Sequence, residues 1–143
     1  MTVLRCLIDS MIFDAIAAEE GLTARVDRAT SAGRVQLLAA HESVLQIAAT
    51  PDPARRVALR RVRVLVVPGP DEDDPAHALM LARLRAAPGV DRDDARIASA
   101  AALAAVPLVT EDRALRAAVA EALPVVTCWD WAHDLRPRLL AAG

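Results

Sequence analysis

Three aspartates stand where a parallel α/β fold would place catalytic carboxylates. Asp9 follows the apolar run Val3–Ile8, and Asp112 lies just past a second apolar run, Leu108–Val109. Asp94 stands at the expected start of an alanine-rich helix. Each could simply cap a helix, since aspartate is a favoured N-cap residue. The carboxyl ends of parallel strands, however, meet at one edge of the sheet, where open α/β folds bind ligands. The repeated placement therefore predicts that the three carboxylates converge into one site.

Such a cluster favours a hard divalent cation. Two like charges about 4 Å apart repel each other by roughly 4 kcal/mol at an effective dielectric constant of about 20. Mg²⁺ and Mn²⁺ prefer oxygen ligands, keep bound waters and bind phosphates. The chemistry that these residues predict is metal-assisted phosphodiester hydrolysis, in which a metal-activated water attacks and the metal stabilises the leaving oxygen. The expected metal ligands are Asp9, Asp94 and Asp112.

The elements that must position these carboxylates alternate along the chain. Apolar strand-like runs are separated by segments with helical periodicity, which predicts a three-layer α/β/α sandwich with a parallel sheet. At 143 residues, of which 55% are hydrophobic and 2% aromatic, a single domain spanning 1–143 is expected. No apolar run approaches the roughly 18 residues of a membrane span, and no secretory signal precedes the first strand, so we expect a cytoplasmic protein without a membrane partner.

Several site classes are excluded by composition. All 17 basic residues are arginine, so the lysine that a phosphate-binding P-loop requires is missing. The same absence disfavours a response-regulator-like domain, the alternative fold with clustered aspartates. The two cysteines have no zinc-site spacing. The acidic loop Pro68–Pro75 lacks the alternating ligands of an EF-hand and is expected to be solvated. A net charge of −2 argues against a wholly basic nucleic-acid-binding surface.

Local patterns predict the other elements beside the site. A second strand is expected at Val35–Ala39, followed by a helix that Ser43 caps and that ends near Ala49. A final strand is expected at Val125–Cys128. The arginine-rich run Arg55–Arg63 could hold RNA phosphates or form a solvated helix face, and the pattern does not separate these two interpretations.

Three segments resemble those of PIN domains. They read LIDS at Leu7–Ser10, VLVVPGP at Val64–Pro70 and DDARIASAAALAAVPLVTED at Asp93–Asp112, and the Thr110-x-Asp112 ending is the most specific element. The resemblance covers nearly the whole chain. It implies a parallel α/β sandwich with a Mg²⁺- or Mn²⁺-dependent nuclease site. Short prokaryotic members are most often VapC-like toxins of type II toxin–antitoxin pairs, so the resemblance also implies an RNA substrate, an antitoxin partner and a homodimer.

The resemblance assigns roles to individual residues. Asp9, Asp94 and Asp112 match three acidic positions of the family. Ser10 and Thr110 match hydroxyl positions that support the metal or order the adjoining loop.

The fourth acidic position of the family departs from the pattern. The glutamate that usually follows the second strand falls at Gln46, whose amide can offer an oxygen but no charge. Glu42 lies four residues earlier, near the same helix face. It could be the fourth catalytic acid, or simply an acidic residue that the helix dipole favours in the first turn. Two functions therefore stay open. One is a metal-dependent endoribonuclease, and the other is a catalytically weakened PIN-like module that binds RNA or a protein partner.

Overall fold

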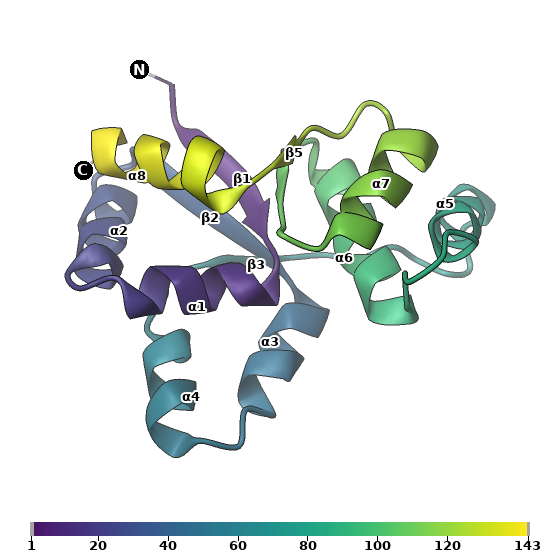
Figure 1. The fold of residues 1–143 in the computed structure, drawn as a ribbon. Helices are drawn as coiled ribbons and strands as arrows, with labels where there is room; N and C mark the ends of the chain where they lie inside the picture. The colour runs from purple at the N-terminus through teal and green to yellow at the C-terminus, as the bar shows by residue number, and fades with distance from the viewer. Residues whose placement is uncertain (1, 143) are drawn as a thin grey trace.

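The computed structural model describes residues 2–142 as a parallel sheet flanked by helices (Figure 1). The strands are β1 Leu4–Ile8, β2 Val35–Ala40, β3 Leu65–Val67, β4 Leu108–Val109 and β5 Cys128–Trp129. The helices are α1 Ser10–Ala18, α2 Leu22–Ser31, α3 His41–Ala48, α4 Pro53–Arg60, α5 Pro75–Arg85, α6 Arg92–Ala104, α7 Arg113–Ala122 and α8 Arg136–Ala142, with a π-helical turn at Trp131–Leu135 before α8.

All strand pairs in the sheet are parallel, as the sequence predicts. The strand order is β3-β2-β1-β4-β5, so β1 lies at the centre and β3 and β5 at the edges. Ile8 pairs with Val109, which brings the carboxyl ends of β1 and β4 side by side. The amide of Asp9 then donates to the carbonyl of Val109 over 3.0 Å. The residues that follow the two central strands are therefore neighbours.

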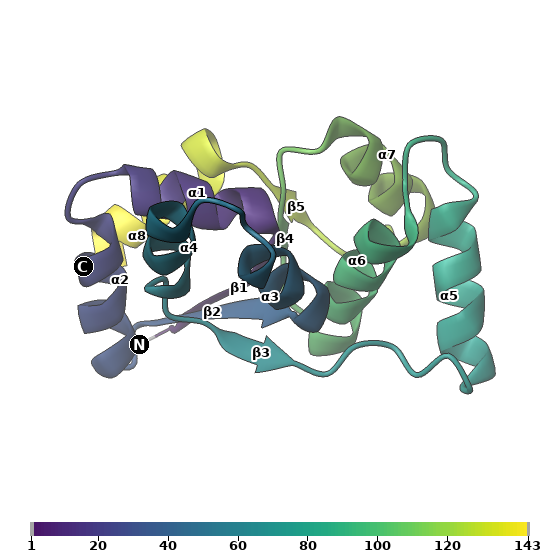
Figure 2. The same ribbon diagram turned by 90° about the horizontal axis from the view of Figure 1, so that it is seen from below.

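Two hydrophobic cores lie on opposite faces of this sheet. Successive strand side chains alternate between faces, so Cys6 and Ile8 of β1 enter one core and Leu7 enters the other. The first core packs against α1, α2, α4 and α8, and the second against α5, α6 and α7. The predicted three-layer α/β/α fold is confirmed, and the two helical layers are visible on either side of the strands in Figures 1 and 2.

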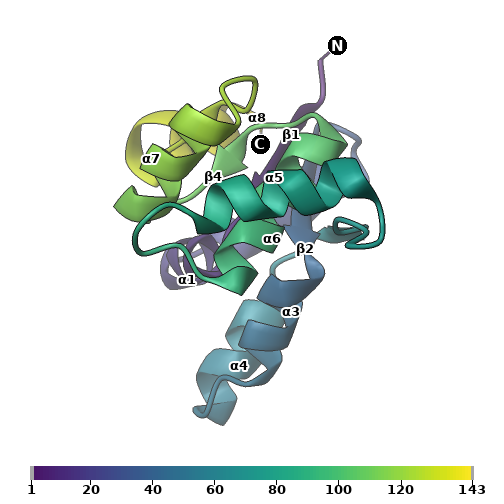
Figure 3. The same cartoon turned by 90° about the vertical axis from the view of Figure 1, so that its right-hand side faces the viewer.

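Helices α3 and α4 form a hairpin that projects from the rest of the molecule (Figure 3). An ion pair between Asp14 of α1 and Arg55 of α4 holds it, with two N–O distances of 2.8 Å. The charge of Arg55, one of the arginines of α4, is therefore already neutralised by Asp14. Within residues 2–142, no helix has both the length and the apolar composition needed to cross a membrane.

Two predicted boundaries are wrong. The last strand is Cys128–Trp129 instead of Val125–Cys128, because Val125 is 88% exposed and lies outside the sheet. Ser43 is not the cap of α3, since the helix already begins at His41. Ala40 ends β2 and directly precedes α3, so the chain passes from strand to helix without a side-chain cap.

Candidate active site

Asp9 directly follows β1 at the carboxyl edge of the sheet and is 4% exposed. Its Oδ1 accepts hydrogen bonds from the backbone N–H and the hydroxyl of Ser10, over 2.7 and 3.5 Å. Its Oδ2 accepts from the hydroxyl of Thr110 over 2.8 Å. Burial raises the pKa of Asp9, although the bonds from Thr110 and Ser10 oppose the shift and the charge of Asp112 adds to it. The fold thus holds a carboxylate where its charge is poorly solvated.

Thr110 connects Asp9 to Asp112. Its fully buried hydroxyl donates to Asp9 and also accepts from the backbone N–H of Asp112 over 3.2 Å. Asp112 caps α7 by accepting from the amide of Leu115 over 3.1 Å. The hydroxyls of Ser10 and Thr110 therefore both donate to the Asp9 carboxylate.

Asp94 does not open its helix, contrary to the sequence prediction. The N-cap of α6 is Asp91, and Asp94 is the third helical residue. The two form a capping box: Asp91 accepts from the Asp94 amide over 2.8 Å, and Asp94 accepts from the Asp91 amide over 3.4 Å. This reciprocal arrangement satisfies two backbone donors instead of one, which explains the earlier helix start.

The three aspartates influence one another electrostatically. Burial raises the pKa of Asp94 from 3.8 to about 6, and the charges of Asp91, Asp112 and Asp9 add to the shift while the bond from the Asp91 amide opposes it. Their mutual repulsion is the condition that a bound cation would relieve.

The carboxylate oxygens of the three aspartates suit a hard cation, but their side chains do not surround a common ion position. Asp9, Asp94 and Asp112 offer only oxygen atoms, which suits Mg²⁺ or Mn²⁺. Among residues 2–142, no three His, Cys, Asp or Glu side chains lie close enough together to enclose an ion. A metal held by these aspartates would therefore have to draw their carboxylates together.

Glu42 and Gln46 have different surroundings. Glu42 is the second residue of α3, and its Oε2 accepts from Nε of Arg96 over 2.9 Å. Gln46 is exposed one turn later and lines a cleft of about 340 Å³ that Ser10 and Met11 also line. The sequence did not single out Arg96, because its partner Glu42 is 54 residues away in the chain.

Pocket size does not identify this site. A larger cavity, about 530 Å³, lies between α5 and α7 and is lined by residues such as Arg83, Ala87 and Glu121. None of the three aspartates lines it. We place the candidate site at the carboxyl edge of the sheet because Asp9 and Asp112, joined there through Thr110, supply groups that could do chemistry, whereas the cavity is lined largely by alanine.

Comparison with known proteins identifies the fold through solved structures. The crystal structure of PAE2754 from Pyrobaculum aerophilum matches with a TM-score of 0.57 at 19% identity, covering 97% of this chain and 95% of that chain. VapBC2 from Rickettsia felis, crystallised bound to a DNA fragment from its promoter, matches with a TM-score of 0.56 at 10% identity, covering 90% and 99%. No protein-family model matches the chain, and no curated protein matches it in sequence. The chain therefore shares the fold of PAE2754 and VapBC2, a three-layer α/β/α sandwich with a parallel sheet.

Proposed function

We propose that this protein is a Mg²⁺- or Mn²⁺-dependent endoribonuclease. The observation that carries the proposal is that the buried Thr110 hydroxyl joins Asp9 and Asp112 at the neighbouring carboxyl ends of β1 and β4, where the charges of both also act on Asp94. These three residues would hold the metal, with Ser10 and Thr110 orienting Asp9. When bound, the ion would supply an activated water and stabilise charge on the leaving oxygen of an RNA phosphodiester.

The biological role that fits this activity is the toxin of a type II toxin–antitoxin pair. VapBC2, which shares the fold, was crystallised bound to a DNA fragment from its promoter. We propose that the partner of this chain is an antitoxin protein. Such a toxin would act on RNA in the cytoplasm. We also propose a homodimer, supported by the apolar side chains Leu65 and Val66 that the edge strand β3 leaves 51% and 46% exposed. Sedimentation of the purified chain as a monomer at micromolar concentration would exclude that dimer.

The alternative is a weakened module that binds RNA or a protein without efficient cleavage. The specific observations in its favour are the neutral Gln46 and the pairing of Glu42 with Arg96. Both reduce the negative charge available to a metal.

Purified protein stripped of metal should separate the two functions. We expect a labelled single-stranded RNA to stay intact in EDTA and to be cut when Mn²⁺ or Mg²⁺ is restored, because the aspartates lack the cation that activates water. Gel electrophoresis follows cleavage, and a filter-binding assay on the same samples follows RNA binding. Binding without cleavage in either metal would establish the alternative, and neither binding nor cleavage would reject both.

Gln46→Glu tests whether α3 faces the metal. If it does, the added carboxylate should tighten Mn²⁺ binding by about tenfold, roughly 1.4 kcal/mol, because it attracts the ion at short range. Titration calorimetry measures the affinity. Gln36→Glu is the matched control, since it adds the same charge on β2, where Gln36 accepts from Arg5. Equal affinities for the two variants would show that Gln46 does not face the ion.

A further inference from the structure

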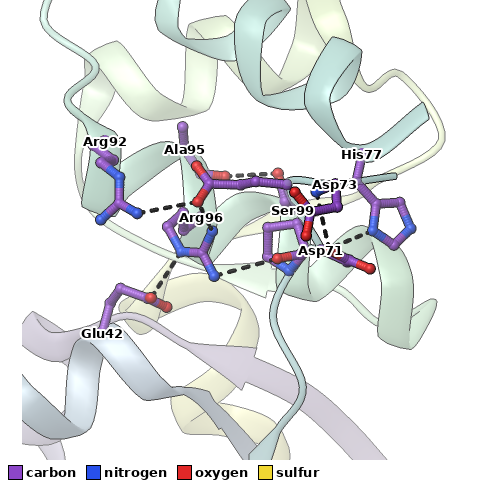
Figure 4. Close-up of polar contacts among 10 residues, drawn as sticks. Glu42, Asp71, Asp73, His77, Arg92, Ala95, Arg96 and Ser99 are labelled. Atoms are coloured by element: carbon purple, nitrogen blue, oxygen red, sulfur yellow. Dashed lines mark hydrogen bonds and ion pairs between the residues drawn. The ribbon is translucent and has the colours of Figure 1, made fainter. Parts of the chain in front are cut away.

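Glu42 and Arg96 form a shielded ion pair beside the candidate site (Figure 4). Nε of Arg96 donates to Oε2 of Glu42 over 2.9 Å, and the two side chains are 15% and 11% exposed. The other carboxylate oxygen of Glu42, Oε1, is buried and has no hydrogen-bond partner within residues 2–142. Within the part of the chain that the structure describes, Arg96 is the cation that pairs with Glu42.

The guanidinium of Arg96 contacts two other segments of the chain. Besides Glu42 on α3, it contacts the loop between β3 and α5, where Nη2 donates to the carbonyl of Pro70 over 3.3 Å and Nη1 lies 3.5 Å from Glu72. The loop approaches so closely that a Cβ on Gly69 would lie 3.1 Å from Nη2. The surroundings of Arg96 are thus shaped for a planar guanidinium, which lysine could not reproduce.

Arg96 anchors the same helical turn that carries Asp94. The two residues are two positions apart on α6, so their side chains leave the helix roughly 200° apart. One side of the turn presents Asp94 with its capping box to Asp91, and the other side is fixed through Arg96 to α3.

We propose that Arg96 and Glu42 are positioning residues, whose ion pair fixes the first turn of α6 and so the position of Asp94. Glu42 acts through Arg96 and is not a metal ligand. This inference rests on the proposed metal-dependent function. It also assigns a role to Gly69, which leaves room for the guanidinium.

A double-mutant cycle distinguishes this role from direct metal binding by Glu42. Arg96→Met should weaken Mn²⁺ binding and slow single-turnover RNA cleavage by at least about tenfold, since it leaves Glu42 buried without a counter-charge and releases the turn. Adding Glu42→Gln to Arg96→Met should then restore part of both losses, because it removes that charge. Arg92→Met is the matched control: it removes the same charge from the same turn, but its pair with Glu72 is more than half exposed. It should change both quantities by less than about twofold.

The opposite pattern would overturn the proposal. If Glu42 were a ligand, Arg96→Met would free it and tighten Mn²⁺ binding, and adding Glu42→Gln would abolish the gain. Amide hydrogen exchange gives a reading that does not depend on activity. The Asp94 and Ala95 amides, which donate to Asp91, should exchange faster in Arg96→Met and more slowly again in the double variant. If Arg96→Met does not fold, Arg96→Gln, which also removes the positive charge, carries the same comparison with and without Glu42→Gln. Unchanged exchange in the variants that fold would refute the positioning role.

The two proposals fail in different ways. Wild-type protein that neither binds Mn²⁺ nor cuts RNA would reject the proposed function, and the exchange data would still decide whether Arg96 fixes the turn. Wild-type protein that binds and cuts normally, with no loss in Arg96→Met, would reject only the positioning role.

Discussion

Asp94→Asn should lower metal-dependent RNA cleavage by about 10³-fold, the equivalent of roughly 4 kcal/mol of transition-state stabilisation. Asparagine has the same shape, and its amide oxygen can still accept from the Asp91 amide, so the capping box and the helix should persist. What the variant removes is one of the negative charges that would hold the metal. Single-turnover cleavage at saturating Mn²⁺ measures the loss.

Asp93→Asn is the matched control for this prediction. Asp93 precedes Asp94 in the same helical turn, and its replacement removes the same charge. We expect Asp93→Asn to cleave RNA within about threefold of the wild-type rate, since surface charges outside the site contribute little. Equal losses in the two variants would mean that net charge, and not a specific ligand, controls cleavage.

Mn²⁺ should stabilise the metal-stripped protein at pH 7.5. At about a hundred times the dissociation constant, binding to the folded state alone adds roughly 2.7 kcal/mol to the free energy of unfolding. The reason is that the cation relieves the repulsion among Asp9, Asp94 and Asp112. Thermal unfolding with and without Mn²⁺ measures the effect. Asp94→Asn should abolish most of it, and an equal shift in wild type and variant would place the bound ion elsewhere.

The pH dependence of stability in EDTA supplies a second test of the same repulsion. The pKa of Asp94 rises from 3.8 to about 6 on folding, so the folded state binds this proton more tightly than the unfolded state. The stabilisation from the bound proton is complete below about pH 4 and is lost as the pH rises through about 6. Wild type should lose this contribution over that range. Asp94→Asn, which has no such proton, should show a flatter profile.

Much of the fold follows from local sequence. The apolar runs before Asp9 and Asp112, each followed directly by a helical segment, predicted two parallel strands whose carboxyl ends meet, and the pairing of Ile8 with Val109 confirms this. The resemblance to PIN domains assigned Thr110 a supporting hydroxyl, and in the structure that hydroxyl donates to Asp9. These features could be predicted because strand alternation and helix starts depend on residues close together in the chain.

The starts of α6 and β5 could not be predicted, because neighbouring residues were equally suited to begin the helix or the strand. Asp91 and Asp94 can each cap a helix, and only their reciprocal bonds place the start of α6 at Arg92. Val125 has strand propensity but lies outside the sheet, so β5 begins at Cys128. Propensity alone does not decide such cases, because the sheet register fixes which apolar residues become buried.

The surroundings of Glu42 were decided by tertiary structure alone. From the sequence, Glu42 and Gln46 were equivalent candidates near one helix face. Folding brings Arg96 from 54 residues away to neutralise Glu42, while Gln46 is left exposed beside Ser10. The sequence by itself determined which carboxylates follow the central strands, since that order is local. Which charges are compensated depends on contacts between distant segments, and these exist only once α3, α6 and the Gly69–Pro70 loop have packed together.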